Sequence, residues 1–311
     1  MSLFALFKSA GPTGFGYGST AEQITEGLSL AGRSILVTGC NSGIGRETCR
    51  VLALRGALVL GTARTKEKAD AACTTFPGRA IGYACELSEP LSVRGCVAAV
   101  KADGHRLDAI ICNAGIMMLP KLKKSHGYEL QFFTNHIGHF MLVTGLLEQL
   151  KDEGRVVMLS SEGHRYAPVG GIEFDNLSGD RGYQPLAAYG QSKFANLLFA
   201  KELQRRFTGT GKTAYAVHPG VVATNLARNL GPVLRRVLAA IGPLFLKSVG
   251  EGAATAVFAA VSAKALPLAG SYLSDSNEDK PRADAEDAAL AMRLWAESEE
   301  IVQVLNDEVS S

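Results

Sequence analysis

The stretch Thr38-Gly39-Cys40-Asn41-Ser42-Gly43-Ile44-Gly45 decides the fold of this chain of 311 residues. It follows a short apolar run at 34–37 and opens a helical pattern that continues to residue 54. Glycines in such a turn allow positive backbone torsions and close approach to a pyrophosphate, and the helix N-terminus offers unpaired amides to the anion. The turn therefore predicts a dinucleotide site, with a purely structural tight turn as the alternative. The expected contacts are Gly39, Asn41, Ser42, Gly43, Ile44 and Gly45.

Strand and helix patterns alternate along the rest of the chain. Helical patterns, such as 128–150 and 187–206, separate short apolar runs typical of buried strands. These further runs lie at 57–60, 81–85, 108–112, 155–160, 214–218 and 271–273. Continuous apolar strands are typical of parallel sheets, and their alternation with helices indicates right-handed βαβ units. We therefore expect an α/β fold, a single Rossmann-type doubly wound domain with a mostly parallel seven-stranded sheet.

Outside that pattern the chain has two distinctive ends and one long apolar segment. Residues 1–29 are expected to form an N-terminal arm with a short helix capped by Ser19 or Thr20. Residues 30–311 are expected to form the dinucleotide-binding catalytic domain, ending in a helix at 286–305. The apolar residues of 221–248 recur at helical spacing and predict a substrate lid, with core or subunit packing as the alternative. In the lid interpretation Lys247 faces solvent or an anionic surface, as do Arg228, Arg235 and Arg236.

The composition excludes several classes of protein. Hydrophobic residues make up 47% of the chain, and a formal net charge of +2 argues against a nucleic-acid partner. The six cysteines include no CxxC pair, so we predict neither a metal site nor a disulfide framework, and we expect a reducing, cytoplasmic location. The apolar run at 3–7 is too short for a transmembrane segment and leaves weak peripheral membrane contact as an option.

The residue after the second strand selects the cofactor. An acid there would bind the ribose of NAD and repel the 2′-phosphate of NADP, but this strand is followed by Ala63 and Arg64. An arginine fork suits a phosphate because it donates two parallel charge-assisted hydrogen bonds. The sequence therefore predicts NADP(H), with a solvated surface arginine as the alternative.

Tyr189 and Lys193 lie four residues apart near the start of a predicted helix and so share one face. A nearby ammonium lowers the pKa of a tyrosine from about 10, which makes the phenol a usable general acid or base. Ser160 and Ser161 end the fifth strand, where a hydroxyl can donate a hydrogen bond to a substrate oxygen. The alternatives are a surface pair on an amphipathic helix and serines that only cap a loop.

Together these residues resemble the short-chain dehydrogenase/reductase family from about residue 30 to residue 275. The TGxxxGIG element of that family stands at 38–45, its NAG element at 113–115 and its PG element at 219–220. Within the family, the stretches 133–140, 161–165, 191–196 and 272–275 are similar to the retinol-dehydrogenase-like branch, which includes the Tic32-type proteins. Three departures are Cys112, where the family has a first asparagine, Glu86, where it has an aspartate, and Ser42, where some NADP-preferring members have a basic residue.

The resemblance implies a role for each of four residues. It implies that Tyr189 is the proton donor in reduction, that Lys193 holds the nicotinamide ribose and tunes the phenol, and that Ser161 orients the carbonyl. It also implies that Asn135 anchors a water connecting Lys193 to solvent. The cofactor contacts that it implies are Glu86, Leu87, Asn113, Ala114, Gly115, Tyr189, Lys193, Pro219, Gly220, Val222 and Thr224.

Two functions from different classes stay open. The first is an oxidoreductase that transfers a hydride between NADP(H) and a small hydrophobic carbonyl or alcohol, since an apolar lid would favour apolar substrates. The second is an NADPH-binding regulatory or scaffold protein with the same fold and little turnover. The sequence leaves open the identity of the substrate and the oligomeric state, for which a homodimer is one alternative.

Overall fold

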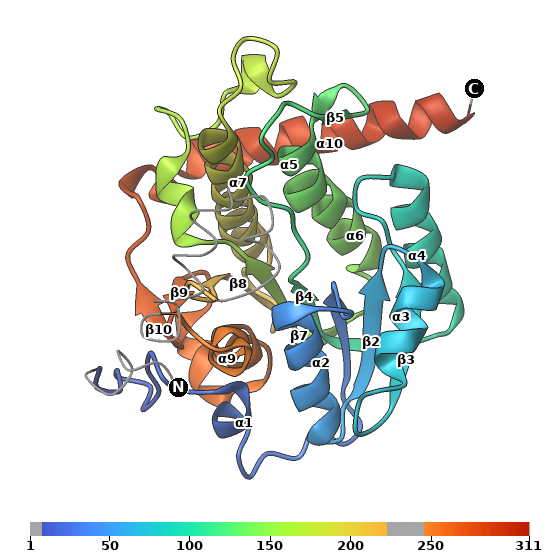
Figure 1. Cartoon of the computed structure of the whole chain (residues 1–311), viewed down its shortest axis with the longest axis vertical. Coiled ribbons are helices and arrows are strands. Elements are labelled where there is room, and N and C mark those ends of the chain that lie inside the picture. Colours follow the sequence, from blue (N-terminus) through green and yellow to red (C-terminus); the bar gives the residue numbers. More distant parts are fainter. Residues whose placement is uncertain (1–7, 223–245, 311) are drawn as a thin grey trace.

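The computed structural model describes residues 8–222 and 246–310. Within them one sheet of eight strands runs in the order β10-β9-β8-β7-β4-β1-β2-β3 (Figure 1). Neighbouring strands pair in parallel, except β9 and β10, which are antiparallel. The strands are β1 (Ser34–Thr38), β2 (Leu58–Ala63), β3 (Ala80–Ala84), β4 (Leu107–Cys112), β7 (Leu150–Leu159), β8 (Thr213–His218), β9 (Tyr272–Ser274) and β10 (Asn277–Asp279). The expected doubly wound, mostly parallel α/β fold is confirmed.

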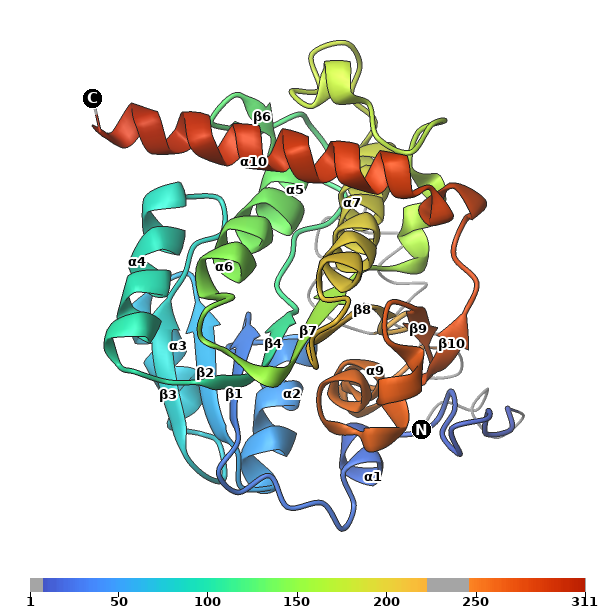
Figure 2. The same cartoon turned by 180° about the vertical axis from the view of Figure 1, so that it is seen from behind.

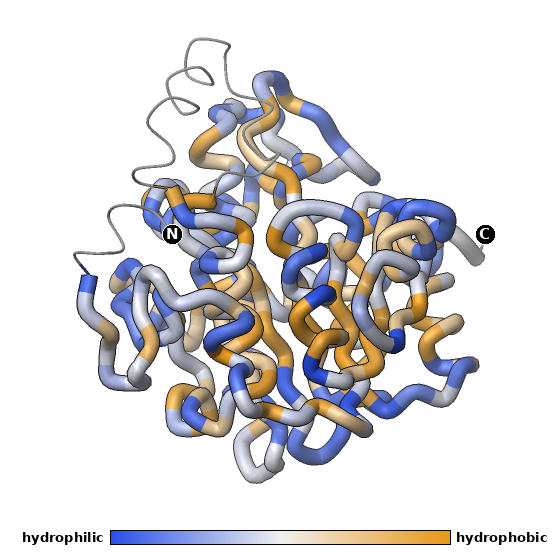
Figure 3. The backbone as a smooth tube through the Cα atoms, turned by 60° about the horizontal axis from the view of Figure 1, so that its bottom comes forward, coloured by the Kyte–Doolittle hydropathy of each residue, from blue (hydrophilic) through white to orange (hydrophobic). Residues whose placement is uncertain are grey.

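Helices cover both faces of this sheet (Figures 1 and 2). The helices are α1 (Ala21–Ile24), α2 (Gly43–Leu54), α3 (Lys66–Cys73), α4 (Pro90–Ala102), α5 (Leu130–Phe132), α6 (Gly138–Leu146), α7 (Pro185–Arg206), α9 (Val249–Val261) and α10 (Ala288–Ser310). Strand β1 shows why both faces need cover, because Leu36 joins the core under α4, α6 and α7. Its neighbours Ile35 and Val37 join the core under α2, α3 and α9. Hydrophobic stretches accordingly gather in the interior, with hydrophilic stretches along the outer turns (Figure 3).

The sheet has one strand more than the seven that we expected. Strand β10 pairs with β9 through a tight turn in which Asp275 and Ser276 both have positive φ, at 52° and 61°. The turn lacks the glycine that usually marks such a hairpin, so its sequence signal is weaker, although Asp275 and Ser276 are both turn-forming residue types. Glu278 and Asp279 in β10 place charge on this edge of the sheet, which discourages pairing with another chain.

The expected helix at 128–150 is wrong in its bounds. The segment begins in a small hairpin, β5 (Lys124–Ser125) with β6 (Tyr128–Glu129), and it ends where Leu150 already starts β7. Between α5 and α6 the backbone forms one π-helical stretch, η2 (Phe133–Ile137). Such widened turns interrupt an α-helix at a cost in regular hydrogen bonding and are frequent at functional sites.

The C-terminal helix crosses the layer formed by α6 and α7 (Figure 2). Helix α10 begins at Ala288 and continues to Ser310, beyond the expected end at residue 305. Trp295 of α10 is buried between Phe140 of α6 and Phe199 of α7, with ring centroids 5.0 and 5.5 Å apart. Helix α10 therefore covers part of the outer surface of α6 and α7.

The N-terminal arm packs against the edge of the sheet, where β9 and β10 lie. Thr13 donates hydrogen bonds to Asn277 Oδ1 and to the Ser276 carbonyl, and Phe15 packs edge-on against Phe258. The expected short helix is α1, whose N-cap Thr20 forms a capping box with Gln23. In the described part of the chain no helix combines the length and apolar character that crossing a membrane requires.

Candidate active site

The glycine-rich turn folds back on β2 at the carboxyl edge of the sheet. Gly39 and Gly43 have positive φ, at 76° and 55°, and the backbone N–H groups of Gly39 and Cys40 both donate to the Thr62 carbonyl at 2.9 Å. A Cβ atom on Gly45 would lie 2.2 Å from the Gly39 carbonyl oxygen, so only glycine fits there. The turn therefore aims the start of α2 at the crevice beyond the strands.

The residues of this turn fit a pyrophosphate. Ser42 stands at the N-cap of α2 in extended conformation, and within the described residues its side chain makes no capping hydrogen bond. The amides of the first turn of α2 therefore keep their donor capacity for an anion. Ile44 is buried below the turn, and Asn41 is exposed at its tip.

Asn113 and His139 link the turn to its neighbours. The Asn113 side-chain amide donates to the Thr38 carbonyl at 2.8 Å, and the Ala114 backbone N–H donates to Thr38 Oγ1 at 2.9 Å. The Asn135 carbonyl oxygen can only accept, so Nδ1 of His139 carries the proton and donates to it at 2.9 Å. Nε2 of the neutral ring, 2.9 Å from Thr38 Oγ1, therefore accepts from the Thr38 hydroxyl. Burial lowers the pKa of His139 to about 4, which suits this neutral bridge.

Asn135 lies in the π-helical stretch η2 and faces α7. Its amide group donates to the Ile116 carbonyl at 3.0 Å and to Ser192 Oγ at 2.9 Å, and its Oδ1 accepts from the Ile116 N–H at 2.9 Å. A Cβ atom added to Gly115 would lie 3.0 Å from Asn135 Oδ1 and 3.4 Å from Lys193 Nζ. Gly115 thus allows the loop after β4 to approach both side chains closely.

Lys193 is buried on the inner face of α7, where its Nζ atom donates to the Leu159 carbonyl at 3.0 Å. Burial lowers the pKa of Lys193 to about 8. The same carbonyl accepts a second hydrogen bond from Asn196 Nδ2 at 3.0 Å. The lysine is thus held at the end of β7.

Tyr189 is buried beside Lys193, whose Nζ atom lies 5.9 Å from the centre of its ring. The expected lowering of the Tyr189 pKa is wrong for this structure. Burial raises the pKa, and a hydrogen bond with Ser161 opposes that rise. The spacing argument weighed only the neighbouring charge, whereas the burial of Tyr189 depends on how the segment after β7, at Gly163, packs against α7.

The two serines at the end of β7 have different surroundings. Ser160 is buried, and its hydroxyl donates to the Lys193 carbonyl at 2.8 Å. Ser161 is partly exposed and caps η3 (Glu162–Tyr166), where its Oγ accepts from the Gly163 N–H at 3.0 Å. Only Ser161 therefore meets both the Tyr189 phenol and the open side of the site.

Arg64 and Glu86 stand together at the carboxyl ends of β2 and β3. The Arg64 Nε atom lies 4.0 Å from a Glu86 carboxylate oxygen, with side chains 66% and 27% exposed. An exposed pair at this distance contributes little to stability, so the guanidinium can turn to an anion. Leu87 is buried, and its carbonyl lies against Gly138 of α6, where a Cβ atom would be only 2.2 Å away.

The residues after β8 complete the same edge. Gly220 follows Pro219 with φ of 83°, and a Cβ atom there would lie 2.5 Å from the side chain of Lys247. Val222 pairs with Lys247 in a short parallel bridge beside α9. The expectations for Thr224 and for most of the lid, including its three arginines, fall outside the described residues.

The expectation that Lys247 faces solvent is wrong. Its side chain is 1% exposed, and its Nζ atom bonds Asp275 Oδ1 at 2.5 Å and lies 4.7 Å from the Tyr17 ring centre. A lysine buried this deeply requires such a partner. The spacing of apolar residues around it could not reveal an acid in the β9–β10 turn.

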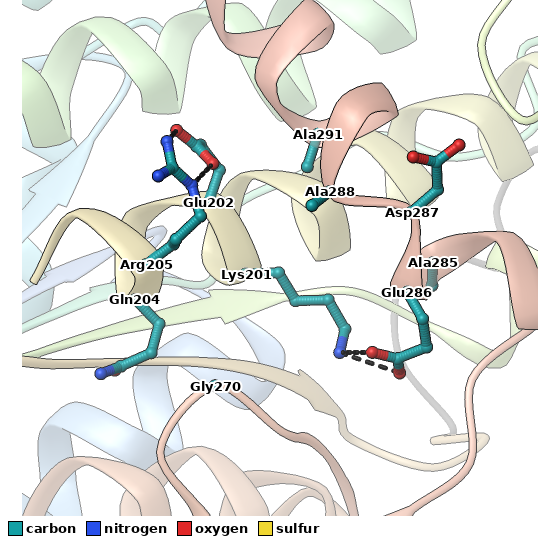
Figure 4. A pocket seen from close by; sticks show the side chains of 10 residues that line it. All are labelled: Lys201, Glu202, Gln204, Arg205, Gly270, Ala285, Glu286, Asp287, Ala288 and Ala291. Carbon is teal, nitrogen blue, oxygen red and sulfur yellow. Dashed lines mark hydrogen bonds and ion pairs between the residues drawn. The ribbon is translucent and has the colours of Figure 1, made fainter. Parts of the chain in front are cut away.

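A separate cavity of about 290 Å³ lies between α7 and the start of α10 (Figure 4). Its walls carry the ion pairs Lys201–Glu286 at 2.8 Å and Arg205–Glu202 at 2.7 Å. Lys201 follows Tyr189 by just over three helical turns, or about 18 Å along α7. This cavity is therefore not part of the candidate active site.

The sheet order and the turn at β1 are typical of dinucleotide-binding folds, and the cluster on α7 lies at the same carboxyl edge of the sheet. A family model described as short chain dehydrogenase matches residues 33–233. The chain belongs to this family, as the sequence resemblance predicted.

Relatives share nearly the whole chain. Retinol dehydrogenase 12 of Mus musculus is 39% identical over 287 residues, covering 90% of this chain and 89% of its own length. Short-chain dehydrogenase TIC 32 A, chloroplastic, of Brassica napus is 37% identical over 310 residues, covering 95% and 97%. Both likenesses agree with the branch that the sequence resembles.

Solved structures give the same picture. A putative uncharacterized protein from Mycobacterium paratuberculosis has a TM-score of 0.73 and 35% identity, covering 90% of this chain and 97% of that one. The RhlG/NADP active-site complex of Pseudomonas aeruginosa has a TM-score of 0.62 and 26% identity, covering 79% and 96%. The fold is thus shared with a protein whose structure holds NADP.

Proposed function

We propose that this chain interconverts a hydrophobic carbonyl compound and its alcohol with NADP(H). The observation that carries the proposal is the convergence of Tyr189, Lys193, Ser161 and Asn135 at the carboxyl edge of the sheet. Tyr189 and Lys193 come from α7, Ser161 from the end of β7 and Asn135 from η2, and their contacts connect them into one cluster. Such a cluster beside a dinucleotide turn supports proton transfer to a substrate oxygen.

Each residue of the cluster has one task in this proposal. NADPH, when bound, supplies the hydride to the carbonyl carbon. Tyr189 gives its phenolic proton to the carbonyl oxygen, and Ser161 donates a hydrogen bond that orients that oxygen. Lys193 holds the nicotinamide ribose and offers positive charge to the developing phenolate, and Asn135 anchors a water toward solvent. Since burial raises the pKa of Tyr189, its phenol carries the proton that reduction at neutral pH needs.

The choice of NADP(H) rests on Arg64 after Ala63. The guanidinium is exposed next to the place where the adenosine ribose would lie, and Glu86 is its weak partner. The likeness to an NADP-bound structure supports the same cofactor. The residues present therefore fit a 2′-phosphate, which would bind the arginine fork in place of the carboxylate.

The substrate class rests on the relatives and on the apolar segment after β8. Several relatives carry the name retinol dehydrogenase, which concerns a hydrophobic alcohol. The test is kcat/KM across straight-chain aldehydes of increasing length with NADPH, with a sugar aldehyde as the control. Each added methylene should improve binding by up to about 0.8 kcal/mol until the pocket is full. A flat series, or a preference for the sugar, would contradict the substrate class.

The second candidate function, a regulatory or scaffold protein, predicts the opposite result in assays of turnover. It requires tight NADPH binding with no turnover of any carbonyl compound. The intact cluster around Tyr189 favours the enzyme, because a binding protein has no need of a buried acid next to a buried lysine. A broad carbonyl screen that follows NADPH oxidation separates the two.

A further inference from the structure

His164 joins two parts of the chain that are 118 residues apart in sequence. Its imidazole is fully buried in η3, shortly after Ser161. The Nδ1 atom lies 2.6 Å from the Ser161 carbonyl oxygen, and the Nε2 atom lies 3.2 Å from the backbone nitrogen of Arg282. The ring also packs edge-on against Tyr272, with centroids 5.0 Å apart. Both ring nitrogens are therefore engaged.

These two contacts fix the proton on one nitrogen. A backbone N–H only donates, so Nε2 of His164 must accept from Arg282. The proton then sits on Nδ1 and is donated to the Ser161 carbonyl. Burial lowers the pKa of His164, which keeps the ring neutral. His164 is thus a fixed bridge between two backbone groups.

The Arg282 end of the bridge is held in place by several contacts of its own. The Arg282 guanidinium donates to the carbonyls of Ala167 and Pro168 at 2.9 and 3.2 Å, just after η3. It also bonds both carboxylate oxygens of Asp284 at 2.6 Å and lies 4.9 Å from the ring centre of Phe194 on α7. The backbone N–H that His164 accepts from therefore belongs to a rigid segment.

The Ser161 end of the bridge lies where η3 packs closely against α7. A Cβ atom on Gly163 would lie 2.7 Å from the Tyr189 ring, and one on Gly190 would lie 2.6 Å from the Ala167 nitrogen. Because the two backbones approach this closely, a small shift of η3 moves the Ser161 hydroxyl relative to the Tyr189 phenol. Small misplacements of reacting groups can reduce rates about a hundredfold.

We propose that His164 is a positioning residue, which holds Ser161 beside Tyr189 by connecting the Ser161 carbonyl to the Arg282 backbone. The inference rests on the proposed function and deepens it, because it assigns the geometry of the Ser161 hydroxyl to a side chain that touches neither substrate nor cofactor. The imidazole takes no part in proton transfer in this role. Its effect passes entirely through Ser161.

Three substitutions separate the two ends of the bridge. His164→Asn keeps an amide N–H near the position of Nδ1 and can still donate to the Ser161 carbonyl. His164→Gln places its amide oxygen near Nε2, so it can accept from Arg282, but it removes the side-chain hydrogen bond to the Ser161 carbonyl. That carbonyl then keeps only its hydrogen bond from the backbone N–H of residue 164, at 3.0 Å in wild type. His164→Phe removes both contacts. The control is His105→Gln. His105 lies on the loop before β4, at the amino-terminal ends of the parallel strands and so on the opposite side of the sheet from the site.

The first measurement is turnover. We expect His164→Gln and His164→Phe to lower kcat by about tenfold or more, with NADPH affinity unchanged within about twofold. His164→Asn should stay within about threefold of wild type. In a Ser161→Ala background His164→Gln should have almost no further effect, because residues that act as one unit are not additive.

The second measurement does not depend on turnover. Tyrosine ring-carbon NMR of the protein, assigned with Tyr189→Phe, reports the pKa of Tyr189. Since the Ser161 hydrogen bond lowers that pKa, His164→Gln should raise it, and His164→Asn should not. Two results would overturn the positioning role of His164. One is that the His164→Asn and His164→Gln variants change kcat and the pKa of Tyr189 equally. The other is that His164→Gln lowers kcat as much in the Ser161→Ala background as in wild type. A wild type without turnover would sink the proposed function alone, since the NMR comparison still decides the role of His164.

Discussion

Lys193 donates a hydrogen bond from Nζ to the Leu159 carbonyl oxygen, 3.0 Å away, at a position where its side chain is almost wholly buried. That carbonyl keeps its second hydrogen bond, from Asn196, whether or not the lysine is present. The charge is therefore held in a place that packing alone would give to an apolar side chain. Function and stability are expected to conflict at this residue.

We predict that Lys193→Met stabilises the protein at neutral pH while removing activity. Burial lowers the folded-state pKa of Lys193 to about 8 from its ordinary value of 10.5, so the buried charge destabilises the fold below pH 8. The gain should approach about 3 kcal/mol at pH 7 and shrink as pH rises from about 8 toward 10.5, where wild type no longer carries the charge. Urea unfolding across that pH range measures it.

Lys68→Met on the exposed side of α3 is the control for this comparison and should change stability little. A stability difference that stays constant with pH would show that the lysine is not titrating as its burial requires. A Met variant less stable than wild type at pH 7 would contradict the prediction directly.

We predict that Tyr189→Phe leaves NADPH binding nearly intact and removes most turnover. Loss of a positioned acid typically lowers the rate by about 10²–10⁴-fold. Tyr166→Phe, on the exposed part of η3, is the matched control and should keep full activity. Retention of more than about half of the wild-type kcat by the Tyr189 variant would remove Tyr189 from the mechanism.

We predict that Arg64→Ala weakens NADPH binding by about tenfold or more and leaves NADH binding nearly unchanged. Only NADPH carries the 2′-phosphate, and a charge-assisted hydrogen bond to it is worth roughly 1.5–3 kcal/mol. Losing the 4.0 Å contact with Glu86 should matter little, because Arg64 is exposed. Titration of cofactor fluorescence measures both affinities. Equal wild-type affinities for the two cofactors would falsify the choice of NADP(H).

Local sequence signals anticipated the parts of the site that local backbone geometry builds. The glycines at 39–45 mark a turn that needs positive φ, and the spacing of Tyr189 and Lys193 follows from one helix turn. The end of the fifth strand pointed to Ser160 and Ser161, and the family resemblance selected Ser161 and added Asn135. All of these lie where a motif of a few residues, read in order, determines the local structure.

The contacts that sequence reasoning missed join distant segments. The Lys247–Asp275 pair and the His164–Arg282 contact depend on how the β9–β10 hairpin and the segment after it pack. The raised pKa of Tyr189 is of the same kind, because burial is a property of the assembled core. Only the spacing of four between Asn135 and His139 offered a local hint, since such residues share a helix face.

The docking of α10 gives the last prediction. Trp295 is 5% exposed, packs on Phe140 and Phe199, and has the Arg206 guanidinium 3.8 Å from its ring centre. Trp295→Ala would leave a cavity between α10 and the helices beneath it. We expect a loss of about 3–5 kcal/mol in the free energy of unfolding. Urea unfolding with fluorescence-independent detection, such as circular dichroism, measures this loss.

The matched control lies on the same helix. Met292 is 43% exposed on α10, so Met292→Ala should change stability by less than about 0.5 kcal/mol. Because Trp295 is remote from the glycine-rich turn, folded Trp295→Ala should bind NADPH as wild type does. The variant also uncovers the aromatic surface of α6 and α7, so we expect it to self-associate in sedimentation experiments. Equal, small effects of the two substitutions would show that α10 is not held by this aromatic contact.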